Sequence, residues 1–238
     1  MLQYLHMLPT FWRGLNDQYK ACFTSKRFWY SFITAIFLLV AGFVISSYAV
    51  QYATESASSS VTDLILSNIP VVDLDGTFVN GAIIMVFFII LICLWQPKRI
   101  PFTVKTISTF MIVRSLFIIL THIGAFPTHA AIHPSSQNLI VDVIGINLYS
   151  STFLGNDSFF SGHTGLPFLM AFIYYDRKWL RVIFITLSII FGVVVLLAKL
   201  HYTIDVMSAF FISYGIYRMS RLLYSHDYQG DFKLEAKN

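Results

Sequence analysis

Residues 182–205 read VIFITLSIIFGVVVLLAKLHYTID, a long apolar run that leads into two ionisable side chains, His201 and Asp205. The run is about as long as the ~20 apolar residues that a helix needs to cross the hydrocarbon core of a bilayer. His201 and Asp205 are four residues apart, so on a helix they share one face. Ionisable groups at membrane depth are costly and indicate function. We therefore predict a transmembrane segment that ends at a functional site.

The composition of the whole chain agrees with a membrane protein. Of its 238 residues, 56% are hydrophobic and 12% are charged, whereas a soluble domain carries about 25% charged residues. The mean hydropathy is +0.68. Most of the protein surface is therefore expected to face lipid rather than water.

Further apolar stretches precede and follow the opening one. We predict an all-α fold, an integral membrane bundle of six transmembrane helices with both termini in the cytoplasm. The expected organisation is an interfacial N-terminal segment at 1–27, a six-span membrane domain at 28–225 and a cytoplasmic tail at 226–238. The six predicted spans are residues 28–50, 78–95, 102–126, 161–175, 182–200 and 201–224.

The distribution of basic residues sets the predicted orientation. With six spans, fourteen of the sixteen Lys and Arg residues fall on the side of the termini, the exceptions being Arg114 and Lys199. Cytoplasmic loops carry such an excess, so the opposite side is expected to be exoplasmic or periplasmic. A bacterial inner membrane and a eukaryotic secretory membrane fit equally. The net charge of +4 is thus a topology signal, and no nucleic-acid partner is expected.

A second polar motif, FFSGHT at residues 159–164, opens the fourth predicted span. Ser161 can cap a helix there, and the free amides of a helix N-terminus favour an anion such as phosphate. An aspartate that accepts a hydrogen bond from the proton-bearing nitrogen of His201 would leave the other ring nitrogen free to act as a base or nucleophile. His163 would then be a separate acid or base. We interpret the pattern as a His/His/Asp phosphoryl-transfer site.

Arg114 lies inside the third predicted span and needs an anionic or polar partner. Two partners are considered, a phosphate and Asp205. Arg114 lies eight residues before His122, about 12 Å along a helix, so the site is expected to lie below the headgroups.

Two other functions are kept as alternatives. A six-span transporter would use Arg114, His163 and Asp205 to line a polar path, although the sequence lacks the paired broken spans of many transporters. An exoplasmic metal-dependent hydrolase would use His129 and His133, which have a spacing that suits a metal on a helix. No Cys or Glu accompanies these two histidines, so we interpret them as loop residues.

Four stretches together resemble the sphingomyelin synthase family, within the type 2 phosphatidic acid phosphatase superfamily. The resemblance extends over roughly residues 68–224. The last two stretches are specific as a pair, and the first two are weak alone. The four are IPVVD at 69–73, VRS at 113–115, GNDSFFSGHT at 155–164 and HYTIDV at 201–206.

This resemblance implies a role for each candidate residue. His201 would attack the phosphorus and become a phosphohistidine, Asp205 would stabilise its imidazolium form, and His163 would protonate the departing lipid alkoxide. The implied partners are a phospholipid donor and a lipid alcohol acceptor (ceramide or diacylglycerol), or water. No metal or other cofactor is implied, and a homo-oligomer is left open. The residues expected to bind the phosphate are Arg114, Ser161, Gly162, Lys199 and Tyr202.

The chain also departs from the wider superfamily. Where that superfamily has a Lys, six residues and then Arg-Pro, this chain has Arg114 and then Thr121-His122. Where it has Ser-Arg before the second histidine, this chain has Val194-Val195. The scarcity of arginines favours the sphingomyelin synthase branch, with Lys199 as a candidate replacement cation. A lipid phosphate phosphatase or a phospholipase C-like hydrolase on the same site is the alternative.

Overall fold

The computed structural model describes residues 2–121, 123, 124, 126 and 160–230, and in this part of the chain every regular element is a helix. The all-α class expected from the sequence is therefore confirmed. The elements are α1 (Leu2–Thr24), α2 (Lys26–Glu55), α3 (Asp75–Trp95), the 3₁₀ turn η1 (Pro97–Arg99), α4 (Ile100–Leu120), α7 (Gly162–Ile173), α8 (Lys178–Leu197), α9 (Thr203–Leu223) and α10 (Ser225–Gln229).

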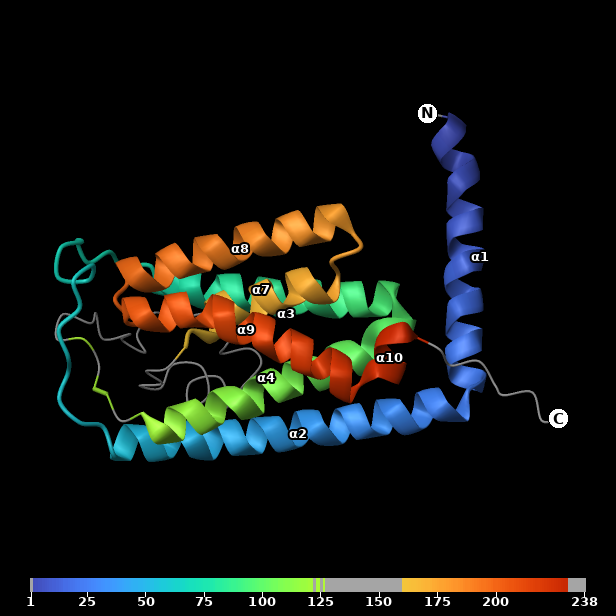
Figure 1. The fold of residues 1–238 in the computed structure, drawn as a ribbon. Coiled ribbons are helices and arrows are strands. Elements are labelled where there is room, and N and C mark those ends of the chain that lie inside the picture. Colours follow the sequence, from blue (N-terminus) through green and yellow to red (C-terminus); the bar gives the residue numbers. More distant parts are fainter. Residues whose placement is uncertain (1, 122, 125, 127–159, 231–238) are drawn as a thin grey trace.

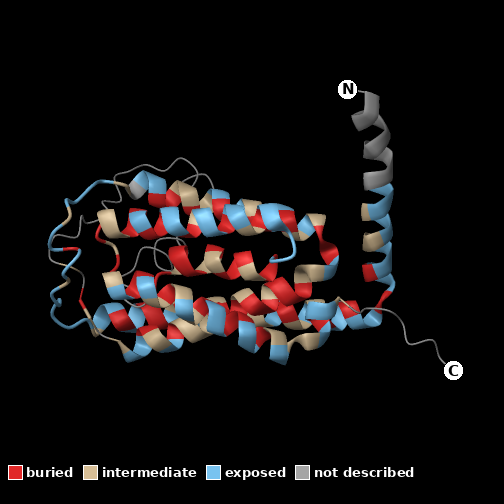
Figure 2. Ribbon diagram, turned by 45° about the horizontal axis from the view of Figure 1, so that its top comes forward, coloured by how far each residue is buried: buried red, intermediate tan, exposed pale blue. Residues whose placement is uncertain are grey.

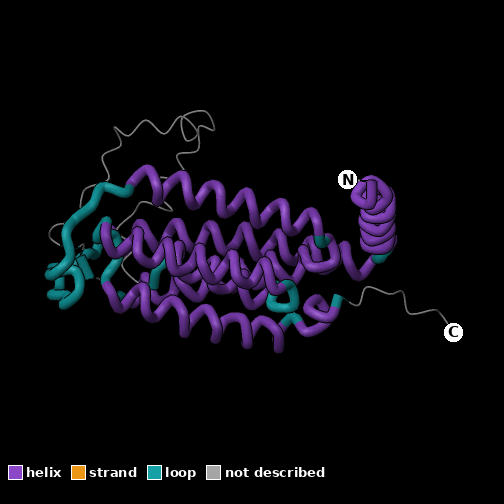
Figure 3. Tube along the Cα trace, turned by 90° about the horizontal axis from the view of Figure 1, so that it is seen from above, coloured by secondary structure: helices purple, strands orange, loops and turns teal. Residues whose placement is uncertain are grey.

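Six helices (α2, α3, α4, α7, α8 and α9) run alternately up and down along one axis, and α1 lies across that axis at one end (Figure 1). The view from above shows α1 nearly end-on beside the same end (Figure 3). Helix α2 packs along α4, whereas α7 packs against α8 and α9. Buried residues gather on the inward faces of these helices (Figure 2). The beginning of α2 and the end of α9 lie at the same end of the bundle.

Among the residues that the structure describes, four stretches are long and apolar enough to cross a membrane: Lys26–Glu55, Gly76–Trp95, Pro97–Leu120 and Lys178–Leu197. Their outward faces carry exposed Ile, Val, Leu and Phe side chains, an apolar surface far too extensive for a soluble monomer. Helix α7 has 12 residues, about 18 Å at 1.5 Å per residue. Helix α9 has 21 residues, but serines and charged residues interrupt its apolar sequence. The bundle thus indicates a membrane protein, while six spans and cytoplasmic termini stay predictions.

The third predicted span, residues 102–126, is shorter in the structure because α4 ends at Leu120. Thr121 takes an extended conformation, and β-branched residues have lower helix propensity than unbranched ones. Arg114 consequently lies six residues from the end of α4, about 9 Å below it.

Side chains from neighbouring helices pack closely against the backbone of the short helix α7. A Cβ atom added at Gly165 would lie 2.8 Å from the Ser213 hydroxyl and 2.9 Å from the Phe110 ring, so only glycine allows this approach. The Ser213 hydroxyl donates to the Gly165 carbonyl at 3.0 Å. On the other side the Ser188 hydroxyl donates to the Thr164 carbonyl at 2.7 Å. Helices α8 and α9 thereby hold the first turn of α7, which carries His163.

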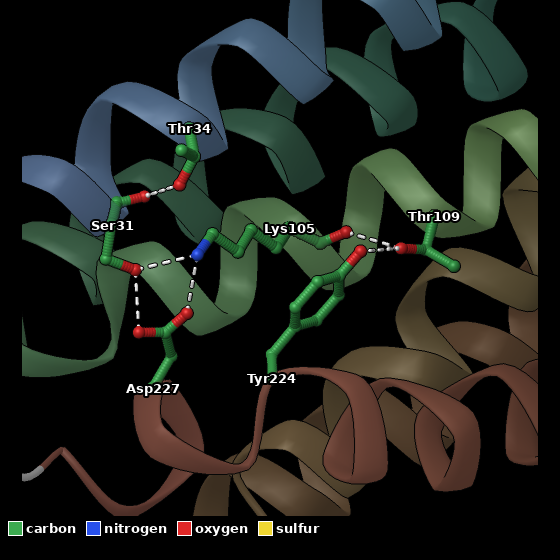
Figure 4. A network of polar contacts seen from close by, with 6 residues as sticks. All are labelled: Ser31, Thr34, Lys105, Thr109, Tyr224 and Asp227. Atoms are coloured by element: carbon green, nitrogen blue, oxygen red, sulfur yellow. Dashed lines mark hydrogen bonds and ion pairs between the residues drawn. The ribbon is translucent and has the colours of Figure 1, made fainter.

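A buried polar network closes the opposite end of the bundle (Figure 4). The Lys105 ammonium donates to the Asp227 carboxylate at 2.7 Å and to the Ser31 hydroxyl at 2.8 Å. Ser31 in turn donates to the second Asp227 oxygen at 2.6 Å. This network joins α2, α4 and α10, so the polar segment expected from residue 226 begins with a helix that packs on the bundle.

Candidate active site

The two histidine motifs meet through the main chain. The Ser161 amide donates a hydrogen bond to the Asp205 carbonyl at 3.1 Å. This bond places the N-terminal turn of α7 beside the first turn of α9. His163 is also close enough to His201 and to Arg114 for their charges to interact. The structure therefore brings together the residues that the sequence analysis assigned to one site.

His201 and Asp205 are almost completely buried, with 5% and 1% of their surfaces exposed. His201 Nδ1 lies 3.7 Å from Asp205 Oδ2, beyond hydrogen-bond distance. The same carboxylate oxygen accepts the Tyr202 amide at 2.9 Å. Within the described part of the chain, Nδ1 has no hydrogen-bond partner. A short movement of Asp205 would complete the pair, and catalytic hydrogen bonds are often long before substrate binds.

The sequence analysis placed His201 at the start of the sixth span, but α9 begins at Thr203. His201 therefore lies in the turn before the helix rather than on a helical face. The Asp63 carboxylate accepts a hydrogen bond from the Thr203 amide, and the Asp205 carboxylate accepts one from the Tyr202 amide. These two hydrogen bonds set the start of α9 two residues after His201. The Ser161–Asp205 main-chain hydrogen bond sets this turn beside the beginning of α7.

His163 follows Gly162 at the beginning of α7, and it is buried between aromatic rings. Its ring centroid lies 3.8 Å from that of Phe78 on α3 and 5.9 Å from that of Phe191 on α8. Such packing fixes the imidazole plane and surrounds it with apolar groups. A proton held on this ring would consequently be shielded from bulk water on the side of α3 and α8.

Arg114 reaches the same turn from α4. Its Nε donates to the Phe160 carbonyl at 3.2 Å. A Cβ atom added at Gly162 would lie 3.3 Å from that Nε, so glycine permits the close approach of the guanidinium. The cation and the N-terminus of α7 thus face one region. Both favour an anion there.

Asp63 is a residue that the sequence analysis missed. Its carboxylate accepts the Thr203 amide at 2.7 Å and the Thr203 hydroxyl at 2.8 Å. It also accepts the amides of Ile65 and Leu66. Burial raises the pKa of this carboxyl, but the hydrogen bonds from Leu66 and Thr203 outweigh that effect and hold the pKa below its ordinary value. The local turn around Asp63 can be recognised in the sequence as an Asx turn. Its contact with Thr203, 140 residues away, cannot be predicted from the local sequence.

Two more contacts tie the connection between α2 and α3 to the site. The Val72 amide donates to the Leu197 carbonyl at 3.0 Å, at the end of α8. The Tyr202 hydroxyl donates to the Gly124 carbonyl at 2.8 Å and accepts the Val61 amide at 3.2 Å. Tyr202 thus joins two connections to the start of α9, and its role as a phosphate ligand stays a prediction.

Lys199 stands in a position that glycine normally occupies. Its φ angle is 52°, the left-handed region that an L-residue enters at a cost. The Leu200 amide donates to the Val195 carbonyl and the Lys199 amide to the Leu196 carbonyl, the hydrogen bonds of a Schellman cap. The side chain is buried, with its ammonium 5.2 Å from the centroid of the Phe126 ring. The chain therefore keeps a cation two residues before His201 where its backbone favours glycine.

The remaining predictions of residue roles are not decided by this geometry. His129 and His133 lie outside the described residues. Ser161 is buried, and its hydroxyl accepts the Thr164 amide at 3.4 Å as the cap of α7. The phosphate-binding roles of Ser161, Gly162 and Lys199 stay predictions.

The fold and the site define a class of protein, a helical membrane bundle that buries two histidines and an aspartate beside an arginine. Residues 155–222 match the family model described as the C-terminal part of the PAP2 superfamily. The matched segment contains His163, His201 and Asp205 but less than a third of the chain. The match supports the PAP2 superfamily, and hence phosphatase or phosphotransferase activity, without selecting the sphingomyelin synthase family within it. No curated protein and no solved structure matches the chain.

Proposed function

We propose that this protein is a membrane-embedded lipid phosphotransferase that moves a phospho-headgroup between lipids through a phosphohistidine at His201. The observation that carries the proposal is the Ser161–Asp205 main-chain hydrogen bond of 3.1 Å. It sets an imidazole from α7 and an imidazole before α9 beside one anion-favouring helix terminus. A displacement at phosphorus needs such a nucleophile, a separate acid and cations for the oxygens.

In the first step His201 Nε2 attacks the phosphorus of a phospholipid, and the bond from phosphorus to the lipid oxygen breaks. His163 gives its proton to the departing alkoxide, which leaves as a lipid alcohol. Asp205 turns toward Nδ1 and stabilises the positive charge on the phosphorylated imidazole. Arg114 and the amides at the start of α7 bind the phosphoryl oxygens.

In the second step the hydroxyl of an acceptor attacks the same phosphorus and the bond to Nε2 breaks. His163, now neutral, takes the acceptor's proton and is ready for the next cycle. The aromatic packing around His163 and the lipid-facing exterior of the bundle favour a lipid alcohol, ceramide or diacylglycerol, as the acceptor. Water in its place would give a hydrolase on the same residues.

The test is a lipid assay on purified protein in detergent micelles. Phospholipids labelled in the headgroup are offered with and without ceramide or diacylglycerol. We expect a labelled product lipid only when an acceptor is present. We expect no product from His201→Ala, and acid-labile label on the parent protein when the acceptor is withheld. His226→Ala is the matched control, because this exposed histidine lies at the other end of the bundle.

Each contrary outcome has a definite meaning. Label released into water regardless of acceptor would replace the transferase with a hydrolase. Loss of activity on chelation would favour a metal-dependent reaction. Full activity of His201→Ala would exclude the phosphohistidine mechanism, and a parent that is inactive in micelles but moves solutes in sealed vesicles would favour the transporter.

A further inference from the structure

A cavity of about 410 Å³ lies at the end of the bundle opposite to the active site. Residues of α1 line it on one side, and residues of η1, the end of α3 and the turn before α8 line it on the other. Its volume is in the range of small-ligand sites. The residues that line it are Gly14, Leu15, Gln18, Trp95, Gln96, Lys98, Arg99 and Arg177.

The charge of this cavity is positive. Lys98, Arg99 and Arg177 line it, and Asp176 is the carboxylate beside them. Arg99 binds Asp176 through two hydrogen bonds of 2.7 and 2.8 Å, whereas Arg177 lies 3.6 Å from the same carboxylate. Lys98 has no ion pair within the described residues. The residues that line the cavity therefore carry three positive charges and no negative one, and an anion would be attracted to the charge that Asp176 does not balance.

Gln96 supplies a second and independent sign of a ligand. Only 8% of this residue is exposed, and it lines the cavity. Its amide nitrogen is buried and has no acceptor in the part of the chain that the structure describes. A buried donor without an acceptor is costly. A turn of this side chain toward the cavity would bring its amide hydrogens to a ligand that supplies acceptor oxygens there.

The surroundings of the cavity indicate where such a ligand comes from. Helix α1 lies across the bundle axis (Figures 1 and 3), parallel to the surface of a membrane that the bundle crosses. The rings of Trp95 and Trp179 lie 5.7 Å apart at this level, and aromatic rings of this kind concentrate at the headgroup region. The exposed Leu94 and Trp179 lead from the cavity to the lipid-facing surface of α3 and α8.

We infer that this cavity binds the phosphate of an anionic phospholipid from the leaflet opposite to the active site. Lys98 and Arg177 contact the phosphate oxygens and Gln96 donates its amide hydrogen to one of them. The acyl chains lie along α3 and α8. The bound lipid also bridges α1 to the bundle, next to the hydrogen bond of 2.7 Å from the Tyr19 hydroxyl to the Leu94 carbonyl. This binding site is separate from the phosphotransferase site and does not depend on its reaction.

The test measures thermal unfolding of the full chain in a neutral detergent, in a His201→Ala background that prevents turnover. The probes are dihexanoyl phosphatidylglycerol, dihexanoyl phosphatidylcholine and inorganic phosphate. A ligand that binds the folded state raises the melting temperature in proportion to its affinity. We expect a concentration-dependent rise with the anionic lipid and at least about a tenfold weaker apparent affinity for the other two probes.

Three variants decide whether the cavity is responsible. Lys98→Gln combined with Arg177→Gln is expected to weaken binding of the anionic lipid at least about tenfold. Lys178→Gln, which removes a cation from the same turn outside the cavity, is expected to bind like the parent. Gln96→Leu is expected to melt no lower than the parent without lipid, because its amide is unsatisfied, and to bind the lipid several-fold more weakly.

Two outcomes would overturn the inference. Equal responses of the double variant and Lys178→Gln would show that the lipid binds elsewhere. Equal affinity for inorganic phosphate and for the anionic lipid would make the ligand a soluble phosphate. The Gln96→Leu variant keeps the test valid if the double variant fails to fold.

Discussion

Two pairs of charged or ionisable side chains are buried in this bundle, and they differ in how completely they are satisfied. At one end the Lys105 ammonium lies 2.7 Å from Asp227 and 2.8 Å from Ser31, and both carboxylate oxygens of Asp227 accept hydrogen bonds. At the other end His201 Nδ1 lies 3.7 Å from Asp205 Oδ2 and has no hydrogen-bond partner among the described residues.

In the proposed mechanism this difference separates a structural pair from a reactive one. A buried ion pair is retained when additional hydrogen bonds compensate for its lost hydration, as Ser31 does for Lys105 and Asp227. A buried imidazole with an unsatisfied nitrogen has the opposite character, because its free energy falls when that nitrogen gains a hydrogen-bond partner, and a positive charge on the ring would make pairing with a carboxylate stronger. A phosphorylated His201 would have both. We therefore expect variants of the first pair to change stability and variants of the second to change activity.

The largest expected effect comes from Asp205→Asn. The amide oxygen of asparagine can still accept the Tyr202 amide, so the start of α9 should be preserved. The charge that stabilises the imidazolium of His201 is lost, and kcat should fall by about 10³ to 10⁴-fold, as for the analogous change in a catalytic triad. The measurement is headgroup transfer by purified protein, with the melting temperature recorded on the same sample. A large loss of stability with unchanged kcat would assign Asp205 to structure.

The next effect is on stability and comes from Lys105→Met. Removal of one partner leaves a buried carboxylate uncompensated, and the free energy of unfolding should fall by about 3 to 5 kcal/mol. The double variant Lys105→Met with Asp227→Leu should recover most of that loss, because no buried charge remains. Thermal and denaturant unfolding in detergent measure both. Headgroup transfer per folded molecule should stay near the parent value, in contrast to Asp205→Asn.

The sequence predicted those features of the two buried pairs that depend on local sequence patterns. Apolar runs located the helices, and two polar motifs at the ends of such runs identified His163, His201 and Asp205. Their meeting could be expected because successive spans alternate in direction, which places both motifs at one end. The sequence also placed Arg114 near the site, and in the structure its Nε donates to the Phe160 carbonyl, one residue before the cap of α7.

The other details depend on contacts between distant segments. Asp63 lies in a loop rich in serine, and nothing local indicates that its carboxylate binds Thr203. The start of α9 at Thr203 rather than His201 follows from that same contact. Helix α7 packs closely against its neighbours at Gly165 and through Ser188, which a count of apolar residues does not register. The partner of Lys105 could not be chosen from the sequence, since Asp227 lies in the polar segment after the last span.

Asp63→Asn tests how far the loop supports the reactive pair. The amide oxygen of asparagine cannot accept both the amide and the hydroxyl of Thr203 as two carboxylate oxygens do, and the loss of a hydrogen bond should cost about 1 kcal/mol of stability. Because Asp63 positions the turn that carries His201, kcat should fall several-fold while KM changes little. Equal reduction of kcat by Leu64→Ala, an exposed neighbour, would argue against this positioning role.

The pH dependence of Asp63 has a definite sign. Its folded-state pKa is below the ordinary value, which is about 3.9 for an unfolded aspartate. Its contribution is therefore fully present above that value and is lost as the pH falls through the lower folded-state pKa. The difference in melting temperature between the parent and Asp63→Asn should be constant from about pH 5 upward and shrink below about pH 4. A difference that grows on acidification would contradict the assignment.

Lys199→Gly should have the smallest effect on stability. We expect this substitution to stabilise the protein but to weaken its activity. Glycine relieves the left-handed backbone at φ 52°, so the free energy of unfolding should rise by about 1 kcal/mol. If the ammonium assists phosphate binding two residues before His201, KM for the phospholipid should rise although the protein is more stable. Lys199→Ala is the matched control, because it removes the same cation while keeping the strained backbone. Both variants should lose the same phospholipid affinity, and only glycine should raise the melting temperature. A glycine variant with full activity would assign Lys199 to packing against Phe126, and the reactive end would then bind its phosphate through Arg114 and the α7 amides.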